Sequence, residues 1–397
     1  MQGFSLLTPA RTLFGRGTLS RAADEIARVG QRILLVRSGS VAWADVLAAD
    51  LGARDVQVVL LQSGGEPAID DVRHGVAKAR EIAADCIVSV GGGATIDLGK
   101  AISGLCMSGG DPTDYLGVGK SPPPRLQDPV AFVAIPSTSG TGAEATRNAV
   151  ITLPERQLKI SLRDPRLVPD LALIDPALTD DLPKGLTLST GLDALTQLIE
   201  SYLCNRSNLL TDALCRDTIP MAITALRRLM DDPDSAARDV MAQASYISGI
   251  ALANSGLGIV HGLAAVIGSR GGAHGAICGR LLPAALIVNR EAMIERGHAT
   301  GRIDQVDAWL SAALGTGPGD QQAGHGARSL RDFMDRHSLA SLGHLHCGPE
   351  VWTDVAQNAR TASSTKANPV DLSEREIARI LELSELLPDR WTRSGVI

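Results

Sequence analysis

The sequence changes its pattern near residue 183, and this change constrains the fold more than any other feature. Before that point, apolar runs expected to form strands alternate with stretches expected to form helices. The expected strands are 31–39, 56–62, 85–90 and 129–137, and the expected helices are 41–53, 69–84 and 91–106. Such alternation predicts a parallel sheet covered by helices.

After residue 183 the chain carries long apolar helical stretches at 186–203, 210–230 and 240–269. A last helix is expected at 372–387, with Ser373 as its N-cap and Glu376 at capping-box spacing. We therefore predict two domains, an α/β domain over residues 1–183 and an all-α domain over residues 184–397.

Composition and charge exclude several classes of protein. The net charge of −6 argues against a nucleic-acid partner. The six cysteines include no C-x-x-C pair, and the N-terminus lacks a charged segment followed by an apolar one, so we expect reduced thiols and a cytoplasmic protein. Residues 240–269 lack Asp, Glu, Lys and Arg, but Gln243, Asn254 and His261 indicate buried helices rather than a membrane span.

Two glycine-rich loops follow expected strands in the first domain. Gly91–Asp97 opens a helix, where glycines allow close approach and free N–H groups favour phosphate oxygens. Pro136–Thr146 offers several hydroxyl groups among glycines. Either loop alone is as well explained by a simple turn, and the first is not the G-x-G-x-x-G fingerprint. Together they predict a nucleotide site.

The second domain carries scattered residues that could hold a divalent metal. Asp193 and Gln197 are four apart and would share a helix face, while His261 and His274 come from later segments. An Asp and two His can bind a metal and leave a position open for substrate. Gln197 is a weak ligand, and a lone His261 is otherwise most simply a hydrogen-bonded core residue.

These motifs resemble the iron-containing (group III) alcohol dehydrogenases along almost the whole chain. The matching segments are Phe14–Leu19, Gly91–Lys100, Pro136–Glu144, Gly191–Glu200, Gly256–His261 and Asn368-Pro369. The resemblance implies a dinucleotide-binding α/β domain followed by an all-α domain, as in dehydroquinate synthase, with NAD(P) and a divalent metal, Fe(II) or Zn(II). It also implies a homodimer.

The resemblance assigns roles to individual residues. The metal ligands would be Asp193, His261 and His274, which are also the catalytic residues, with Gln197 at a fourth ligand position. The cofactor would be contacted by Ser38, Gly92, Gly93, Ala94, Asp97, Thr138, Ser139, Thr141 and Lys159, with Lys159 beside the nicotinamide ribose.

Three positions depart from the family pattern. Gln197 stands where the family has a His ligand, although glycerol dehydrogenases hold zinc with one Asp and two His. Ala265 stands where the family has a second His beside the nicotinamide, so a side-chain proton relay is missing there. The segment between His261 and His274 is one residue short and carries Arg270 where an aromatic residue is frequent.

The expected activity is hydride transfer between NAD(P)(H) and a small alcohol or aldehyde. Arg270, Arg147 and Asn148 would suit an anionic aldehyde bearing a carboxylate, sulfonate or phosphonate, such as phosphonoacetaldehyde. Ser38 replaces an Asp that would repel a 2′-phosphate, so NADPH is allowed. The alternatives are a metal-dependent lyase of the dehydroquinate synthase type and a non-catalytic nucleotide-binding relative.

Overall fold

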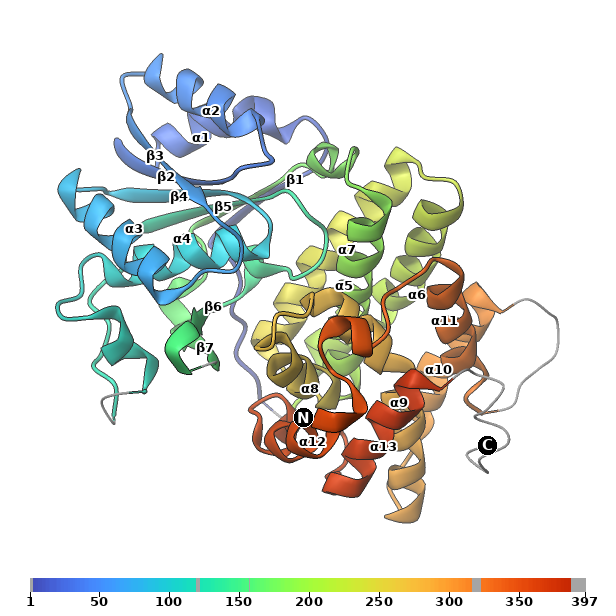
Figure 1. Cartoon of the computed structure of the whole chain (residues 1–397). Helices are drawn as coiled ribbons and strands as arrows, with labels where there is room; N and C mark the ends of the chain where they lie inside the picture. The colour runs from blue at the N-terminus through green and yellow to red at the C-terminus, as the bar shows by residue number, and fades with distance from the viewer. Residues whose placement is uncertain (1–2, 119–121, 157, 316–322, 387–397) are drawn as a thin grey trace. The chain divides into compact units, whose positions relative to one another are not determined.

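The computed structural model describes residues 3–118, 122–156, 158–315 and 323–386. Internal contacts divide these residues into two compact units (Figure 1). The α/β unit comprises Leu6–Thr138 and Gly142–Asp181. The helical unit begins at Leu182 and also includes Ser139–Thr141 and residues 3–5. The contacts thus place the division after Asp181, where the sequence places it after residue 183.

A parallel six-stranded sheet forms the centre of the α/β unit. Its strands, in spatial order, are β1 (Arg11–Phe14), β8 (Leu171–Ile174), β5 (Ala131–Pro136), β4 (Cys86–Gly91), β2 (Arg32–Ser38) and β3 (Gln57–Ser63). All neighbouring strands pair in parallel. The inner strands are therefore buried on both faces and read as continuous apolar runs.

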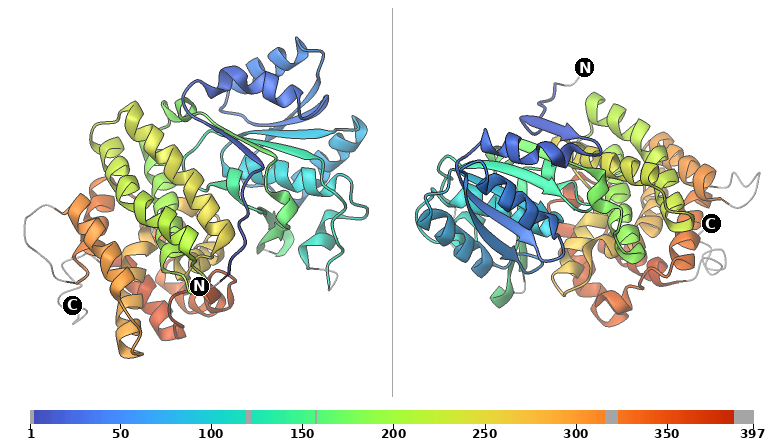
Figure 2. Two further views of the ribbon diagram at one scale, coloured as in Figure 1. Left: turned by 180° about the vertical axis from the view of Figure 1, so that it is seen from behind. Right: turned by 90° about the horizontal axis from the view of Figure 1, so that it is seen from above.

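Helices cover both faces of this sheet (Figures 1 and 2). Helices α1 (Ala22–Ala27) and α2 (Trp43–Gly52) lie on one face, and α3 (Ile69–Glu81) and α4 (Gly93–Leu105) on the other. Successive strand residues point to opposite faces, so the strands feed two separate cores. Ile33, Leu35 and Val88 join the core with α1 and α2, whereas Leu34, Val36 and Ile87 join the core with α3 and α4.

An antiparallel hairpin of β6 (Asn148–Leu153) and β7 (Leu158–Arg163) extends this unit. The Asp97 carboxylate on α4 accepts a hydrogen bond from the Val150 amide at 3.0 Å, which fixes the hairpin against the helix. Neither this hairpin nor the short strand β8 was predicted from the sequence pattern.

Nine α-helices make up the described part of the helical unit. They are α5 (Lys184–Leu203), α6 (Leu209–Asp231), α7 (Ser235–Asn254), α8 (Ile259–Gly268), α9 (His274–Glu295), α10 (Gly301–Leu314), α11 (His325–Arg336), α12 (Trp352–Thr361) and α13 (Glu374–Glu385). One continuous apolar core joins them. Ser373 and Glu376 form the predicted capping box at the start of α13.

The uncharged stretch 240–269 is not one long helix. It covers most of α7 and the whole of α8, which meet at a bend of 101°. Within the residues that the structure describes, no single helix has both the length and the hydropathy of a membrane span, and only this bent pair passes that test when taken together.

The predicted fold class is confirmed in both parts. The predicted strands and helices before residue 140 form, as do the helices predicted at 186–203, 210–230 and 372–387, with ends that move by a few residues. The stretch 240–269 is divided between α7 and α8. The Gly271-Gly272 pair separates α8 from α9, because glycine interrupts regular structure. Proline did not mark turns everywhere, since Pro220 lies inside α6 and Pro283 inside α9.

Candidate metal and nucleotide sites

One face of α5 carries three polar residues into the interior of the helical unit. Asp193, Gln197 and Glu200 are spaced by four and three residues, so they follow one another along this face. All three side chains are buried. A buried carboxylate needs hydrogen-bond donors or a cation nearby, so this face must meet compensating groups.

Glu200 meets the first turn of α8. Its carboxylate accepts hydrogen bonds from the Val260 amide at 2.7 Å and the His261 amide at 3.3 Å. The Asn368 side chain accepts from the Ile259 amide at 3.1 Å. The amides of a first helical turn lack partners within the helix, and a negative charge there is favourable, so the two side chains anchor α8 at the turn that carries His261.

Gly258 makes this anchoring possible. A Cβ atom at Gly258 would lie 2.7 Å from Glu200 Oε1 and 2.8 Å from Asn368 Oδ1. The Asn368 amide group is in turn bonded to Asn289 Oδ1 at 2.6 Å and to the Val370 carbonyl at 2.8 Å. The Asn-Pro motif near the C-terminus thus has a structural explanation, because Asn368 caps α8.

Two glycines bring α9 against α5. A Cβ atom would lie 2.3 Å from the Ser189 carbonyl oxygen at Gly275, and 2.6 Å from Leu192 at Gly279. The two glycines are four residues apart and so share a helix face. The close approach sets His274, at the start of α9, beside Asp193.

Asp193, His261, His274 and Cys278 converge at one point. His261 Nε2 lies 3.5 Å from Asp193 Oδ1, His274 Nε2 lies 3.7 Å from the same oxygen, and Cys278 Sγ lies 3.7 Å from His274 Nε2. One ligand atom from each of the four residues lies within 4.8 Å of all the others. The structure therefore brings together the predicted Asp193, His261 and His274.

Two atoms of this cluster are left without a hydrogen bond. Among the described residues, Asp193 Oδ1 and His261 Nε2 are buried and have no hydrogen-bond partner. The other ring nitrogen, His261 Nδ1, lies 2.6 Å from Glu200 Oε2. If Nδ1 holds the proton toward this carboxylate, Nε2 presents a lone pair to the cluster, the arrangement found behind metal-binding histidines.

Both histidines of this cluster have a raised pKa. The interaction with Cys278 raises the pKa of His274 to about 9, with a further contribution from Asp193 and against the effect of burial. Burial lowers the pKa of His261, but its interactions with Cys278, Asp193 and Glu200 raise it well above its ordinary value. A metal ion would supply the positive charge that these protons otherwise provide, so metal binding would release protons.

The donor set fits a divalent metal. Carboxylate, imidazole and thiolate are all common ligands of zinc, and imidazole also suits iron. Donors bound to one tetrahedral ion at roughly 2.0–2.3 Å lie about 3.3–3.8 Å from one another. The three spacings given above fall in this range.

Gln197 has a hydrogen-bond partner of its own, and Cys278 joins the cluster. The Gln197 amide lies 3.2 Å from the Ser248 hydroxyl group on α7. Cys278 was not among the predicted site residues. The available signal was its position one turn after His274, since residues four apart on a helix share a face.

The first glycine-rich loop has the geometry of a phosphate site. Strand β4 ends at Gly91, Gly92 is the N-cap of α4, and Gly93 and Ala94 begin the helix with its free amides. A Cβ atom at Gly92 would lie 3.4 Å from Thr138 Oγ1, so Thr138 borders the same loop. The predicted cofactor set has five further members, which are Ser38, Asp97, Ser139, Thr141 and Lys159.

Those five residues lie in different surroundings. Ser38 ends β2, with its hydroxyl group 3.0 Å from that of Ser40. Asp97 binds the Val150 amide, and Lys159 forms an ion pair with Glu66. Ser139 and Thr141 belong to the helical unit.

Lys100 and Glu144 are two buried charged residues in the same unit as this loop. Lys100 on α4 is fully buried, and its ammonium group donates to Thr146 Oγ1 at 2.7 Å and to the Asn148 carbonyl at 3.1 Å. Burial lowers the pKa of Lys100 to about 8. Burial also raises the pKa of Glu144 to about 7, although the charge of Lys100 acts in the opposite direction.

The predicted substrate residues lie in two places. Arg270 follows α8 and forms an ion pair of 2.6 Å with Asp354 on α12, with 35% of its side chain exposed. Arg147 and Asn148 lie at the start of the β6–β7 hairpin in the α/β unit. Ala265, one turn after His261, is exposed and offers no proton-transfer group.

The comparisons with known proteins decide the family. A profile of the iron-containing alcohol dehydrogenases matches residues 9–176, and the C-terminal profile of the same family matches residues 187–384. The chain belongs to the iron-containing alcohol dehydrogenase family. It is thus an alcohol or aldehyde oxidoreductase, as the resemblance implied, and this family favours the dehydrogenase over the lyase alternative.

Three relatives illustrate the similarity. Alcohol dehydrogenase 4 of Schizosaccharomyces pombe is 35% identical over 69% of this chain and 65% of its own length. NAD-dependent methanol dehydrogenase of Bacillus methanolicus is 29% identical over 94% of this chain and 98% of its own. Lactaldehyde reductase of Escherichia coli is 33% identical over 73% of this chain and 77% of its own.

A solved structure shares the fold across the whole chain. The crystal structure of a 1,3-propanediol oxidoreductase is 28% identical, has a TM-score of 0.84, and covers 96% of this chain and all of its own length (100%).

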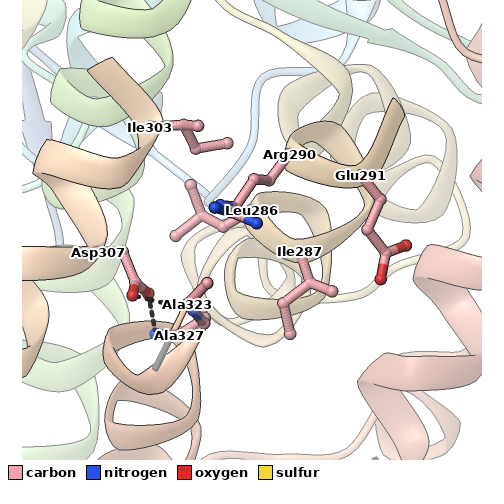
Figure 3. Close-up of a pocket in the computed structure, with 9 residues that line it drawn as sticks. Leu286, Ile287, Arg290, Glu291, Ile303, Asp307, Ala323 and Ala327 are labelled. Atoms are coloured by element: carbon pink, nitrogen blue, oxygen red, sulfur yellow. Dashed lines mark hydrogen bonds between the residues drawn. The ribbon is translucent and has the colours of Figure 1, made fainter. Parts of the chain in front are cut away.

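A hollow of about 130 Å³ lies elsewhere in the helical unit, between α9, α10 and the start of α11 (Figure 3). Its charged residues have structural partners. Arg290 pairs with Asp304 at 2.6 Å, Glu291 pairs with Arg379 at 2.5 Å, and Asp307 accepts from the Gly324 and Ala327 amides. These contacts tie α10, α11 and α13 to their neighbours, so we assign this hollow no chemistry.

We predict that Glu200→Gln weakens metal binding by about 10–100-fold, because the carboxylate orients His261 from behind. Equilibrium titration against a competing chelator measures this change. Glu291→Gln, which removes a carboxylate from an ion pair on α9, should bind metal like the wild type. An unchanged affinity in Glu200→Gln would mean that Glu200 serves only to cap α8.

We predict that Glu144 makes the α/β unit less stable as the pH rises. Its folded pKa is raised above the ordinary 4.5 to about 7, so its stabilising contribution is complete below 4.5 and is lost as the pH rises through 7. Between pH 5 and 7 this amounts to a loss on the order of 2 kcal/mol.

Urea unfolding at several pH values tests this prediction. Glu144→Gln should flatten the fall in stability over this window, whereas Glu155→Gln, at an exposed position of the same unit, should keep the wild-type profile. Parallel profiles for wild type and Glu144→Gln would contradict it.

Proposed function

We propose that this protein catalyses reversible, metal-dependent hydride transfer between NAD(P)(H) and a small alcohol or aldehyde. The observation that carries the proposal is the pair of buried, unpartnered atoms, Asp193 Oδ1 and His261 Nε2, within the described residues. They lie next to His274 in a cluster with metal-ligand chemistry. The glycine loop from Gly91 to Gly93 supports a nucleotide site in the same chain.

The residues divide the task in a simple way. When bound, a divalent metal would act as a Lewis acid toward the substrate oxygen, and the nicotinamide would carry the hydride. Asp193, His261 and His274 would hold the metal, and Glu200 would keep the proton of His261 on Nδ1. Since Ala265 offers no proton relay, protons would pass through water or the cofactor ribose hydroxyls.

The cofactor choice rests on the end of β2. Ser38 stands where a carboxylate would repel a 2′-phosphate, so we propose that NADPH is accepted as well as NADH. The neighbouring Arg37 forms an ion pair of 2.5 Å with Asp45, which reduces its positive charge toward a phosphate. One relative carries the name NAD-dependent methanol dehydrogenase, and this supports a nicotinamide cofactor for this chain too.

For the substrate, we propose a short aldehyde bearing an anionic group, such as a carboxylate, a sulfonate or the phosphonate of phosphonoacetaldehyde. Arg270 follows the helix that carries His261 and retains N–H groups beyond the one bonded to Asp354. One relative is named lactaldehyde reductase, and lactaldehyde is also a short aldehyde. We also propose that the protein is cytoplasmic and forms a homodimer.

The proposed activity is tested by following NADPH and NADH oxidation by absorbance with short neutral and anionic aldehydes. We expect oxidation that chelation of the protein abolishes and that Zn(II) or Fe(II) restores. Absence of oxidation with every aldehyde and both cofactors after metal addition would favour a lyase or a non-catalytic protein.

We predict that Arg270→Ala raises KM for anionic aldehydes by roughly tenfold and leaves KM for neutral aldehydes nearly unchanged. The reason is the loss of one charge-assisted hydrogen bond to the substrate. Arg360→Ala, an exposed arginine on α12, is the matched control. Equal effects of Arg270→Ala on both substrate types would show that Arg270 acts only through Asp354.

A further inference from the structure

We propose that Cys278 is the fourth protein ligand of the metal, in place of the histidine that the family pattern has at the position of Gln197. The thiolate then shifts the preference of the site from iron toward zinc. This inference rests on the proposed metal-dependent function and adds a ligand and a metal preference to it.

The position of Cys278 supports direct coordination. Cys278 follows His274 by one turn of α9, and its side chain is fully buried. Its Sγ atom lies 3.7 Å from His274 Nε2 and within 4.8 Å of the ligand atoms of Asp193 and His261. A metal bound by the other three residues would therefore lie close to this sulfur atom.

The unpartnered atoms point to a ligand independently of the cysteine. Asp193 Oδ1 and His261 Nε2 lie 3.5 Å apart, and neither makes a hydrogen bond to the residues that the structure places, although both are buried. Leaving buried polar atoms without partners is unfavourable unless something else binds them. A cation between these two atoms removes the penalty for both.

Gln197 leaves the fourth ligand position to another residue. It lies one turn after Asp193, but its amide is hydrogen-bonded to the Ser248 hydroxyl group on α7. An amide is also a neutral ligand. Asp193 and a thiolate at Cys278 would each bring a negative charge to a divalent ion, which offsets its positive charge in a buried site better than a neutral amide does.

The chemistry of sulfur sets the metal preference. Binding converts the Cys278 thiol to a thiolate, and its proton leaves to solvent. A thiolate is a soft ligand that suits zinc, whereas a site of carboxylate and imidazole ligands suits iron as well. The Asp, two His and one Cys of this chain are therefore better suited to zinc than the family pattern of one Asp and three His.

Cobalt substitution tests the inference without measuring activity. The full-length protein is stripped with a chelator and loaded with Co(II), and metal content and absorption spectra are recorded. We expect one Co(II) per chain and an intense near-ultraviolet charge-transfer band from thiolate to cobalt. Cys278→Ser and Cys278→Ala should lose this band. Their zinc affinity in a competition assay should be about 10–100-fold lower than that of the wild type.

Cys215→Ser is the matched control, because Cys215 is a fully buried cysteine on α6, outside the cluster. It should keep the band and the zinc affinity. Binding of Co(II) without the thiolate band in the wild type would overturn the role of Cys278 and leave the proposed function standing. Failure of the wild type to bind Co(II) or Zn(II) would contradict both.

Discussion

The buried carboxylate of Asp193 is the constraint around which the helical unit is organised. Within the described chain its Oδ1 atom makes no hydrogen bond, and the Nε2 atoms of His261 and His274 lie 3.5 Å and 3.7 Å from it. Since an isolated buried charge is strongly destabilising, the fold must supply positive charge at this point. Protonated histidines can do so, and a divalent metal can do so while also performing chemistry.

Hydrogen bonds to a helix end and close contacts at glycines hold the compensating groups in place. Glu200 and Asn368 bind the first amides of α8 and so set His261, with Gly258 leaving room for both side chains. Gly275 and Gly279 let α9 approach α5 and set His274 and Cys278. The site is thus held by helix ends and close helix contacts in a rigid core, which favours precise ligand placement.

Sequence periodicity and glycine placement were sufficient to predict the two-part architecture and the helix that begins at Gly93. Asp193, His261 and His274 could be grouped before their geometry was known, because residue type and family spacing both pointed to a metal. Cys278 was missed, since a lone cysteine in an apolar helix reads as a core residue. The role of Asn368 depends on contacts between residues 109 positions apart, which sequence patterns do not encode.

The most direct test is a crystal structure of the metal-loaded protein with anomalous diffraction recorded at the zinc and iron absorption edges. We predict a single zinc peak bonded to Asp193, His261 and His274, with Cys278 Sγ at about 2.3 Å from it. A metal peak elsewhere, or no peak among these residues, would contradict the proposed centre.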